Sequence, residues 1–336
     1  MQPVDHIPSE SMRAAVVQAA PVYLDLEASV ARAVEFIDQA AREGARLVAF
    51  PELWLPGYPW WLWLAPPAWA AATGIDARYR LNALSYDDPI AARVCAAARR
   101  NRIFVSMGLA ERDRGSLYVS QWLIGDDGST IARRRKLKPG AAERVLFGEG
   151  DARDLRVDAT SIGRIGALCC AEHRHPLFKY ALFAQAEQIH VGAWPSFSVY
   201  QPFSPGQSPD VCLSISRAHA IEGGCFVLAP SSPVTPDMLA RVCDTEDKAR
   251  LLAVGGGHAA AFGPHGTSLA APIAPDEEGL LLCDLDFGQI RAAKGGYDVV
   301  GHSHRPDAVG LRLGAAEIRT RGAADGAPPV DAALDR

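Results

Sequence analysis

The sequence lacks the basic, secretory and zinc-binding signals that mark several common protein classes. Its 336 residues carry a formal net charge of −5, and the basic run ARRRKLK at 132–138 is too short to indicate a nucleic-acid surface. The first residues, MQPVDHIPSESMRAAVV, have no basic start followed by an apolar core, so we expect no secretory signal. The seven cysteines form no CxxC pair, which favours free thiols in a reducing cytoplasm.

Charge is absent from residues 53–72, LWLPGYPWWLWLAPPAWAAA. Twenty uncharged residues are long enough to cross a membrane, but four prolines and a glycine would interrupt a membrane helix. Five of the seven tryptophans lie in this segment. We therefore expect no membrane association and interpret the segment as an aromatic-rich loop that leads into a short helix and forms a pocket wall or an oligomer interface.

Apolar strands and helices alternate along the chain. The candidate strands RAAVVQAA (13–20) and ARLVAFPE (45–52) flank a helix that Asp25 can cap and Gly44 can end. A strand–helix–strand unit implies a parallel pair of strands. Because sheets need burial, the interleaved helices predict an α/β fold of two mixed sheets packed face to face with helices outside.

Residues 13–313 are expected to form a single domain, after a flexible N-terminus (1–12) and before a disordered tail (314–336). Pro176 is well suited to open a helix whose inner stripe is Leu177, Ala181 and Ala184. Further strands are predicted at 102–112, 116–125, 129–136, 163–170, 188–194 and 225–230, helices near 88–101, 176–187 and 209–222, and a C-terminal meander of GHAAAFGPHG, SLAAPIA and GLLLCDLDF.

Glu52 ends the second apolar strand, directly before the aromatic segment. A surface carboxylate at a strand terminus is the common alternative. Shielding by the aromatic residues would raise the pKa of Glu52, which is the condition for a general base and acid near neutral pH. Glu52 is therefore a candidate catalytic group.

The basic run contains a second candidate. Along a strand, residues 134 and 136 share one face and residues 133 and 135 share the other, so Lys136 or Arg135 must point inward if one face is solvated. An inward lysine needs a carboxylate partner, and Glu143 can fold back beyond the turn at Pro139 to provide it. A surface basic cluster with an incidental Glu143 is the alternative.

Two adjacent cysteines, Cys169 and Cys170, end the strand RIGALCC. Neighbouring cysteines rarely bond to each other, so both are read as thiols. Alternation does not choose between them, because both faces of this strand are apolar. A sharp strand-to-helix turn follows before Pro176, and a residue on such an elbow is exposed at the rim of a sheet. We expect Cys170 to occupy the elbow and Cys169 to pack in the strand.

The histidine pairs EHRH (172–175) and GHSH (301–304) are weak metal signals, because His-x-His alone is not specific and adjacent cysteines lack zinc-ligand spacing. A Cys–His protease pair has no local signature either. We therefore predict no metal site.

Four segments together resemble the nitrilase branch of the carbon–nitrogen hydrolase superfamily: FPELWLPGYPWW, RRKLKPGAAER, GALCCAEHRHPLFKYALFAQAEQIHVGAWPSF and VGHSHRPD. They occur in the family's order between residues 13 and 313. The run EQIHVGAWPSF favours nitrilases proper over amidases and carbamoylases, and the aromatic segment is similar to members that act on arylaceto- and other bulky nitriles.

The resemblance implies an α-β-β-α sandwich that forms homodimers and extends into higher oligomers or spiral filaments. It implies hydrolysis of a small-molecule nitrile to an acid and ammonia, with no cofactor. It places catalysis on Glu52, Lys136, Glu143 and Cys170, and substrate contacts on Tyr58, Ala171, Glu172 and Trp194.

The chain departs from the family at two places. Many nitrilases have tryptophan where Ala171 stands, and the turn GAAE (140–143) is less bulky than usual. We expect these changes to alter pocket shape and selectivity. An amidase or N-carbamoyl hydrolase with the same residues is one alternative, and a non-catalytic assembly scaffold is another.

Overall fold

The computed structural model describes residues 8, 11–201, 203–313 and 316–317. Most of the predicted flexible N-terminus (1–12) and of the predicted tail (314–336) lies outside these residues.

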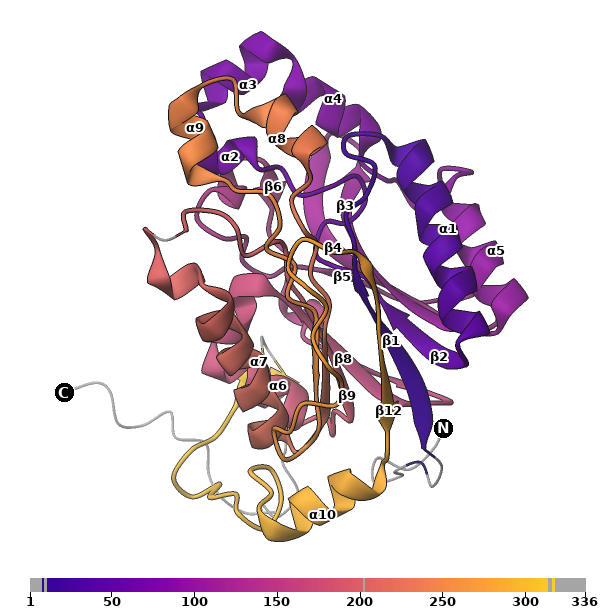
Figure 1. Cartoon of the computed structure of the whole chain (residues 1–336). Helices are drawn as coiled ribbons and strands as arrows, with labels where there is room; N and C mark the ends of the chain where they lie inside the picture. The colour runs from indigo at the N-terminus through magenta and orange to yellow at the C-terminus, as the bar shows by residue number, and fades with distance from the viewer. Residues whose placement is uncertain (1–7, 9–10, 202, 314–315, 318–336) are drawn as a thin grey trace, which may run out of the picture.

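Two β-sheets pack face to face between outer helices, which confirms the predicted α-β-β-α sandwich (Figure 1). The larger sheet has the order β12-β1-β2-β3-β4-β5, with β6 paired to β4, and the smaller has the order β11-β10-β9-β8-β7. The strands of the larger sheet are β1 (Met12–Gln18), β2 (Ala45–Ala49), β3 (Phe104–Asp113), β4 (Ser116–Ile124), β5 (Thr130–Arg135), β6 (Phe147–Gly148) and β12 (Gly279–Leu285). Those of the smaller sheet are β7 (Val157–Thr160), β8 (Gly163–Cys169), β9 (Ile189–Ala193), β10 (Phe226–Ala229) and β11 (Ala260–Phe262), and a separate hairpin joins β13 (Arg312–Leu313) to β14 (Ala316–Glu317).

The helices lie on the outer faces of the sheets and at both ends of the sandwich. In Figure 1, α1 (Leu26–Arg42) and α5 (Ala91–Asn101) lie outside the larger sheet, and α6 (Pro176–Phe183) and α7 (Pro209–Gly223) lie outside the smaller one. The short helices at the upper end are α2 (Trp61–Leu64), α3 (Pro67–Thr73), α4 (Ile75–Asn82), α8 (Pro236–Val242) and α9 (Glu246–Leu251), and α10 (Gly288–Gly296) lies at the lower end.

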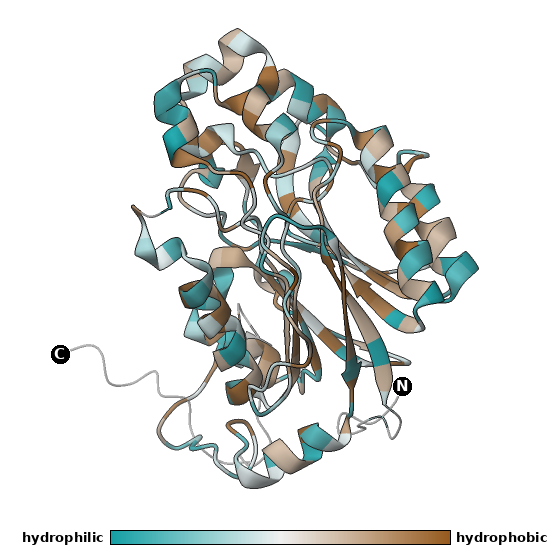
Figure 2. Cartoon of the chain, viewed as in Figure 1, coloured by the Kyte–Doolittle hydropathy of each residue, from teal (hydrophilic) through white to brown (hydrophobic). Residues whose placement is uncertain are grey.

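Strand β1 is apolar on both faces because it is covered on both sides. Ala14 and Val16 pack in the core between the two sheets, whereas Ala15 and Val17 pack in the core beneath α1 and α5. Successive side chains of a strand point to opposite sides, so a strand covered on both sides needs apolar residues at every position. Figure 2 shows brown, apolar residues along the central strands and both colours on the outer helices.

The helix after β1 forms as predicted. The Asp25 side chain accepts a hydrogen bond from the Ala28 amide, which caps the N-terminus of α1. Gly44, at φ 81°, follows the helix and occupies the left-handed region that favours glycine.

Three predicted elements differ from the structure. The predicted C-terminal meander is wrong, because β12 pairs with β1 in the larger sheet and not with β11, and SLAAPIA (268–274) forms no strand. Cys170 is not the last strand residue, since β8 ends at Cys169. Leu177 is 63% exposed and does not belong to the inner stripe of α6; Ala181 and Leu182 do.

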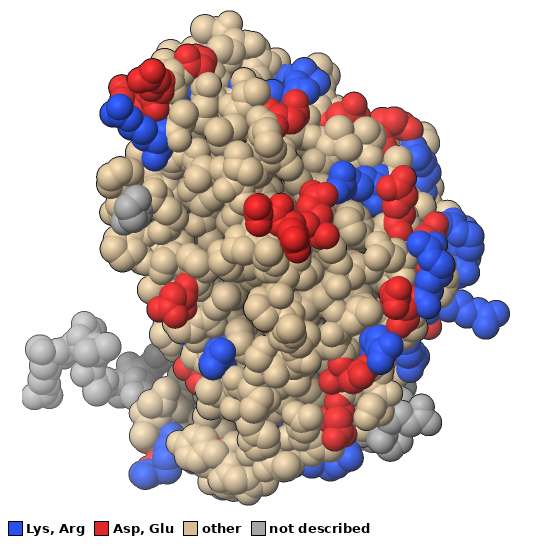
Figure 3. All heavy atoms as spheres, in the orientation of Figure 1, with Lys and Arg blue, Asp and Glu red and all other residues tan. Residues whose placement is uncertain are grey.

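The uncharged segment 53–72 folds against the body of the molecule. It contains α2 and all of α3 but its last residue, and Trp54, Trp60 and Trp61 are almost fully buried. Among the described residues, no helix combines the length and apolar character that a membrane crossing requires. On the face shown in Figure 3, basic and acidic residues are interspersed.

Candidate active site

A cavity of about 210 Å³ lies where β8 ends, between the aromatic segment and the smaller sheet. Its polar lining includes Tyr58, Glu143 and Cys170, and Trp60 and Trp194 contribute apolar walls. Small apolar cavities with a few polar groups are the usual form of a ligand site. The remaining lining residues are Trp63, Gly140, Ala141, Ala171, Arg174, Pro195, Ser196, Phe197, Val199, Gln207 and Cys212.

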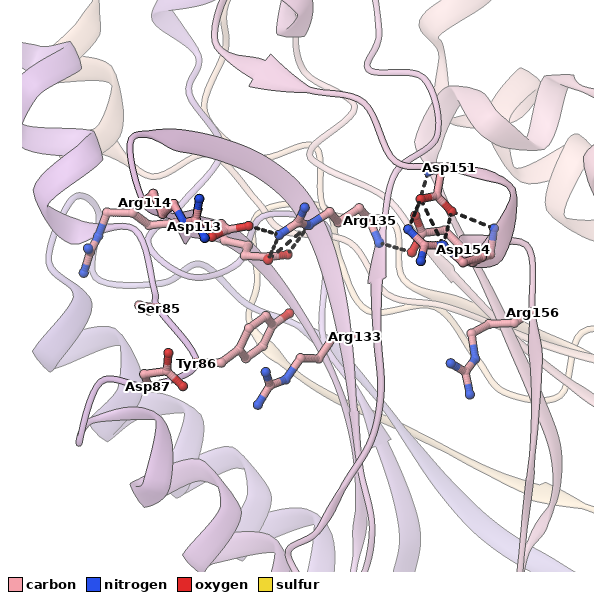
Figure 4. Close-up of a pocket in the computed structure, with 13 residues that line it drawn as sticks. Ser85, Tyr86, Asp87, Asp113, Arg114, Arg133, Arg135, Asp151, Asp154 and Arg156 are labelled. Carbon is pink, nitrogen blue, oxygen red and sulfur yellow. Dashed lines mark hydrogen bonds and ion pairs between the residues drawn. The ribbon is translucent and has the colours of Figure 1, made fainter. Parts of the chain in front are cut away.

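A larger hollow of about 710 Å³ lies elsewhere, at the ends of β3 and β5 (Figure 4). Its charged side chains largely neutralise one another: Arg135 pairs with Glu111 and Asp113, and Arg153 pairs with Asp151. No cysteine lines this hollow. We therefore place the candidate active site in the smaller cavity.

Lys136 lies between two carboxylates, one of which, Glu143, lines the smaller cavity. Its Nζ donates hydrogen bonds to Glu52 Oε1 and to Glu143 Oε2, each at 2.7 Å. All three side chains are buried, with at most 1% exposed. Burial opposes the charge on Lys136, but the two carboxylates outweigh it and raise the lysine pKa well above its ordinary value. Lys136 is therefore a fixed cation.

The chain reaches this arrangement through strand alternation. Arg134 and Lys136 both point inward, whereas Arg135 turns toward Glu111. Of the two residues predicted as alternatives, Lys136 points inward and Arg135 does not. The turn after β5 then brings Glu143 back, where Gly140 N donates to Glu143 Oε2 at 2.6 Å and Tyr58 donates to Glu143 Oε1 at 2.7 Å.

Glu52 is held just beyond β2 by backbone contacts. Its amide donates to the Trp194 carbonyl at 3.2 Å, which joins it to the end of the smaller sheet. Gly108 permits the close approach, because a Cβ there would lie 1.9 Å from the Pro51 carbonyl oxygen. The second carboxylate oxygen, Glu52 Oε2, has no hydrogen-bond partner among the described residues.

The two carboxylates beside Lys136 differ in pKa. Burial, with the negative charge of Glu143, raises the pKa of Glu52 to about 8, although Lys136 opposes the shift. Glu143 is buried too, but Lys136, Tyr58 and the Gly140 amide stabilise its charge and lower its pKa. Groups with pKa values pushed apart in this way can divide proton transfer and charge stabilisation between them.

Cys170 starts the turn after β8 and has φ 44°. Positive φ is rare for a residue with a side chain, so the surrounding structure must hold it there. The elbow predicted from the sequence is present, with Cys170 as its first residue. Burial and the charge on Glu52 raise the Cys170 pKa well above its ordinary value, although Lys136 opposes them. The thiol therefore needs a base to become a nucleophile.

The predicted substrate contacts divide into two groups. Tyr58, Ala171 and Trp194 line the cavity. Glu172 does not: its carboxylate is fully buried and accepts two 2.7 Å hydrogen bonds from Arg134 Nη2. Glu172 also accepts from the amides of Leu137 and Cys169, each at 2.8 Å, so it ties the elbow to the chain after β5.

Arg134 was missed as a site-supporting residue, although a signal for it was present. The alternation that makes Lys136 inward-pointing places Arg134 on the same face. A buried Arg134 needs a carboxylate partner, and Glu172 lies two residues after Cys170 in the sequence.

One histidine from each His-x-His pair has a different partner. His173 Nε2 contacts His190, and His304 contacts Tyr180. Among the described residues, ligand atoms of Glu187, His219 and Cys225 lie within 4.8 Å of one another, buried away from the cavity. Both oxygens of Glu187 already bond to histidines.

Comparison with known proteins agrees with the geometry. Residues 13–295 match the carbon–nitrogen hydrolase family. The chain is 49% identical over 302 residues to a nitrilase of Pseudomonas syringae pv. syringae (90% of this chain, 89% of the relative). It is 47% identical to an arylacetone-specific nitrilase of Alcaligenes faecalis (90% and 84%).

A solved carbon–nitrogen hydrolase from Helicobacter pylori G27 has the same fold, with a TM-score of 0.69 at 18% identity (89% of this chain, 97% of that chain). The family match covers most of the residues that form the sandwich and includes the lysine–carboxylate cluster and the cysteine elbow. This chain therefore belongs to the carbon–nitrogen hydrolase family.

Proposed function

We propose that the protein is a nitrilase, which converts R–C≡N and two waters into R–COOH and ammonia. The observation that carries the proposal is Lys136, held 2.7 Å from both Glu52 and Glu143 and acting on a cysteine at a strained elbow. The similarity to nitrilases over 90% of the chain supports nitriles as the substrates.

In the first step Glu52 removes the Cys170 proton, and the thiolate sulfur bonds to the nitrile carbon. One electron pair of the C≡N bond moves to nitrogen, which takes up the proton from Glu52 and leaves a covalent thioimidate. The raised pKa of Glu52 suits it to accept and return this proton near neutral pH.

Lys136 and the Ala171 amide stabilise the negative charge that develops at nitrogen. The lysine is already desolvated and oriented, so it needs little reorganisation during the reaction. Glu143 orients Lys136 and is itself oriented by Tyr58.

Two hydrolytic steps complete the cycle. Glu52 deprotonates a water that adds to the thioimidate carbon, the nitrogen is protonated and ammonia leaves, and a thioester remains. A second water attacks this thioester, the C–S bond breaks, and the acid and the Cys170 thiol are released. Breaking the C–S bond before ammonia leaves would release an amide as a by-product.

Aromatic side chains suggest the substrate class. Trp60, Trp63, Trp194 and Phe197 line a cavity of about 210 Å³. Aryl- and arylacetonitriles, and bulky aliphatic nitriles, match such walls in size and polarity.

The proposal includes assembly and location. We propose a cytoplasmic homodimer that extends into higher oligomers. Leu177 on α6 and Ile221 on α7 are 63% and 55% exposed on the outer layer of the smaller sheet, where a second copy could cover them. Light scattering of the wild type and of Leu177→Glu tests this, because a charge in the interface should lower the oligomer mass.

Matched substrates test the proposed activity. Ammonia, acid and amide are quantified with phenylacetonitrile and with phenylacetamide. We expect rapid release of acid and ammonia from the nitrile and much slower turnover of the amide. The reverse preference would identify an amidase, and no ammonia from either substrate or from a wider nitrile panel would refute the proposal.

A further inference from the structure

A chain of buried side chains leads away from the backbone of Cys170. His173 Nδ1 lies 2.8 Å from the Cys170 carbonyl oxygen, and His173 Nε2 lies 2.9 Å from His190 Nε2. Glu187 continues the chain, with one oxygen 2.7 Å from His190 Nδ1 and the other 2.7 Å from His219 Nε2. All four side chains are at most 1% exposed, and the reaction described above uses none of them directly.

The partners fix the positions of the protons. A carbonyl only accepts, so His173 Nδ1 carries the proton and donates to Cys170. Burial and the neighbouring histidines lower the pKa of His173, so its ring is neutral and its Nε2 accepts from His190. His190 Nδ1 faces Glu187, whose pKa of about 2 makes it an accepting carboxylate although burial alone would raise that pKa. His190 therefore lies between two acceptors, His173 Nε2 and a Glu187 carboxylate oxygen.

His219 completes the set as a neutral ring. Its Nε2 donates to the second oxygen of Glu187, and its Nδ1 has no partner among the described residues. Burial lowers its pKa to about 4, which agrees with this assignment.

Glycines in the neighbouring strands leave room for the His173 and Glu187 side chains. A Cβ on Gly192 would lie 3.0 Å from His173 Nε2, and a Cβ on Gly166 would lie 2.0 Å from Glu187 Oε1. Trp194 stacks on the His173 ring, with centroids 5.0 Å apart and planes at 19°, and also lines the cavity. The stacked Trp194 ring and the close approach of Gly192 together fix the orientation of the His173 ring.

The hydrogen bond from His173 determines where an amide points. The Cys170–Ala171 peptide bond is trans, so its C=O and N–H groups point in opposite directions. His173 holds the carbonyl on the side of the buried histidines, which directs the Ala171 N–H away from them, and Ala171 itself lines the cavity. The same contact helps to hold Cys170 at φ 44°.

We propose that His173, held by His190 and Glu187, is a positioning residue that directs the Ala171 N–H at the nitrogen where charge develops. The inference rests on the proposed nitrile chemistry. It goes beyond that chemistry by assigning a role to the His173–His190–Glu187–His219 chain, which acts through orientation and exchanges no proton with the substrate.

A matched pair of variants separates orientation from packing. In His173→Asn the amide nitrogen can replace Nδ1 as the donor to the Cys170 carbonyl. In His173→Gln the amide oxygen can replace Nε2 as the acceptor from His190, and the Cys170 carbonyl is left without its donor. We expect His173→Gln to lower kcat on phenylacetonitrile by about ten- to hundredfold with little change in KM, and His173→Asn to keep most of kcat. If His173 acted through packing alone, His173→Gln would keep more of kcat than His173→Asn, because Gln is closer to His in volume.

Glu187 provides a second pair, used as well if His173→Gln fails to fold by circular dichroism. In Glu187→Gln the amide nitrogen can donate to His190 and the amide oxygen can accept from His219, so both hydrogen bonds at this position can be kept. Glu187→Leu removes the hydrogen bonds to His190 and to His219. We expect kcat to be retained in the first variant and lost in the second, and equal losses would contradict the proposal.

Crystal structures of the variants distinguish this inference from the proposed function. Rotation of the Cys170–Ala171 peptide in His173→Gln, together with the wild-type orientation in His173→Asn, would support the inference. An unchanged peptide in both would overturn it. A wild type that releases no ammonia from nitriles would refute the proposed function, and the peptide orientation would then still decide the inference.

Discussion

Adjacent residues at the elbow have different surroundings. Cys169 is fully buried in an apolar cluster at the end of β8, and its amide donates to Glu172. Cys170 lines the cavity under the combined charges of Glu52, Lys136 and Glu143. One step along the backbone therefore separates a packing residue from the proposed nucleophile.

Alanine substitutions test this division. Cys170→Ala is expected to abolish ammonia release from phenylacetonitrile, because the sulfur that bonds to carbon is gone. Cys169→Ala is expected to keep most of the activity, since only a small buried side chain is shortened. Ammonia assays on both folded variants measure the difference, and the reverse result would assign the nucleophile to Cys169.

The raised pKa of Glu52 predicts an unusual pH profile. A base acts when deprotonated, so kcat/KM should rise with pH through an acid limb near the Glu52 value of about 8. An ordinary carboxylate would place this limb near 4.5. Initial rates across pH 4 to 10 measure this limb. Asp113→Asn, which removes an exposed carboxylate that does not line the cavity, should leave the limb unchanged.

Between elements, one buried ion pair joins β5 to the elbow. Arg134 lies in β5 and Glu172 in the turn after β8, and Glu172 also receives the Leu137 and Cys169 amides. The pair fixes the spacing between the strand that precedes Lys136 and the strand that precedes Cys170.

Breaking this pair should destabilise the fold. Glu172→Gln leaves the Arg134 charge buried without a counter-ion, which is expected to lower the free energy of unfolding by about 3–5 kcal/mol. Urea denaturation measures the change. Asp151→Asn removes an exposed partner of Arg153 and serves as the control, with no measurable loss expected. Equal stability of Glu172→Gln and the wild type would show that the pair contributes little.

For the whole molecule, buried titratable groups make stability depend on pH. His219 has a folded-state pKa of about 4 against an ordinary value of 6.5. The unfolded chain then binds more protons between these values, so stability is complete above pH 6.5 and falls as the pH drops toward 4. The loss from His219 alone is about 3 kcal/mol.

His219→Gln tests this dependence, because Gln can keep the hydrogen bond to Glu187 without titrating. Urea unfolding at pH 7 and at pH 4.5 should show a smaller loss of stability in the variant than in the wild type. His265→Gln, which changes an exposed histidine, should behave as the wild type does. If His219→Gln and the wild type lost the same free energy of unfolding between pH 7 and pH 4.5, the lowered pKa of His219 would be contradicted.

The sequence by itself determined what depends on neighbours along the chain. Alternation in ARRRK allowed an inward Lys136, the Asp25 cap and Gly44 marked the two ends of α1, and the break before Pro176 placed an elbow at Cys170. These features follow from local backbone geometry, which every residue carries with it.

Only the tertiary structure decided which distant residues meet. Glu52 and Lys136 lie 84 positions apart, β12 pairs with β1 rather than β11, and Glu172 turns from the cavity to Arg134. Strand order, and the partner of each buried charge, depend on hydrogen bonds between segments far apart in the chain. The alternation of apolar residues along a strand is the same whichever strand lies beside it, so this alternation does not determine the strand order.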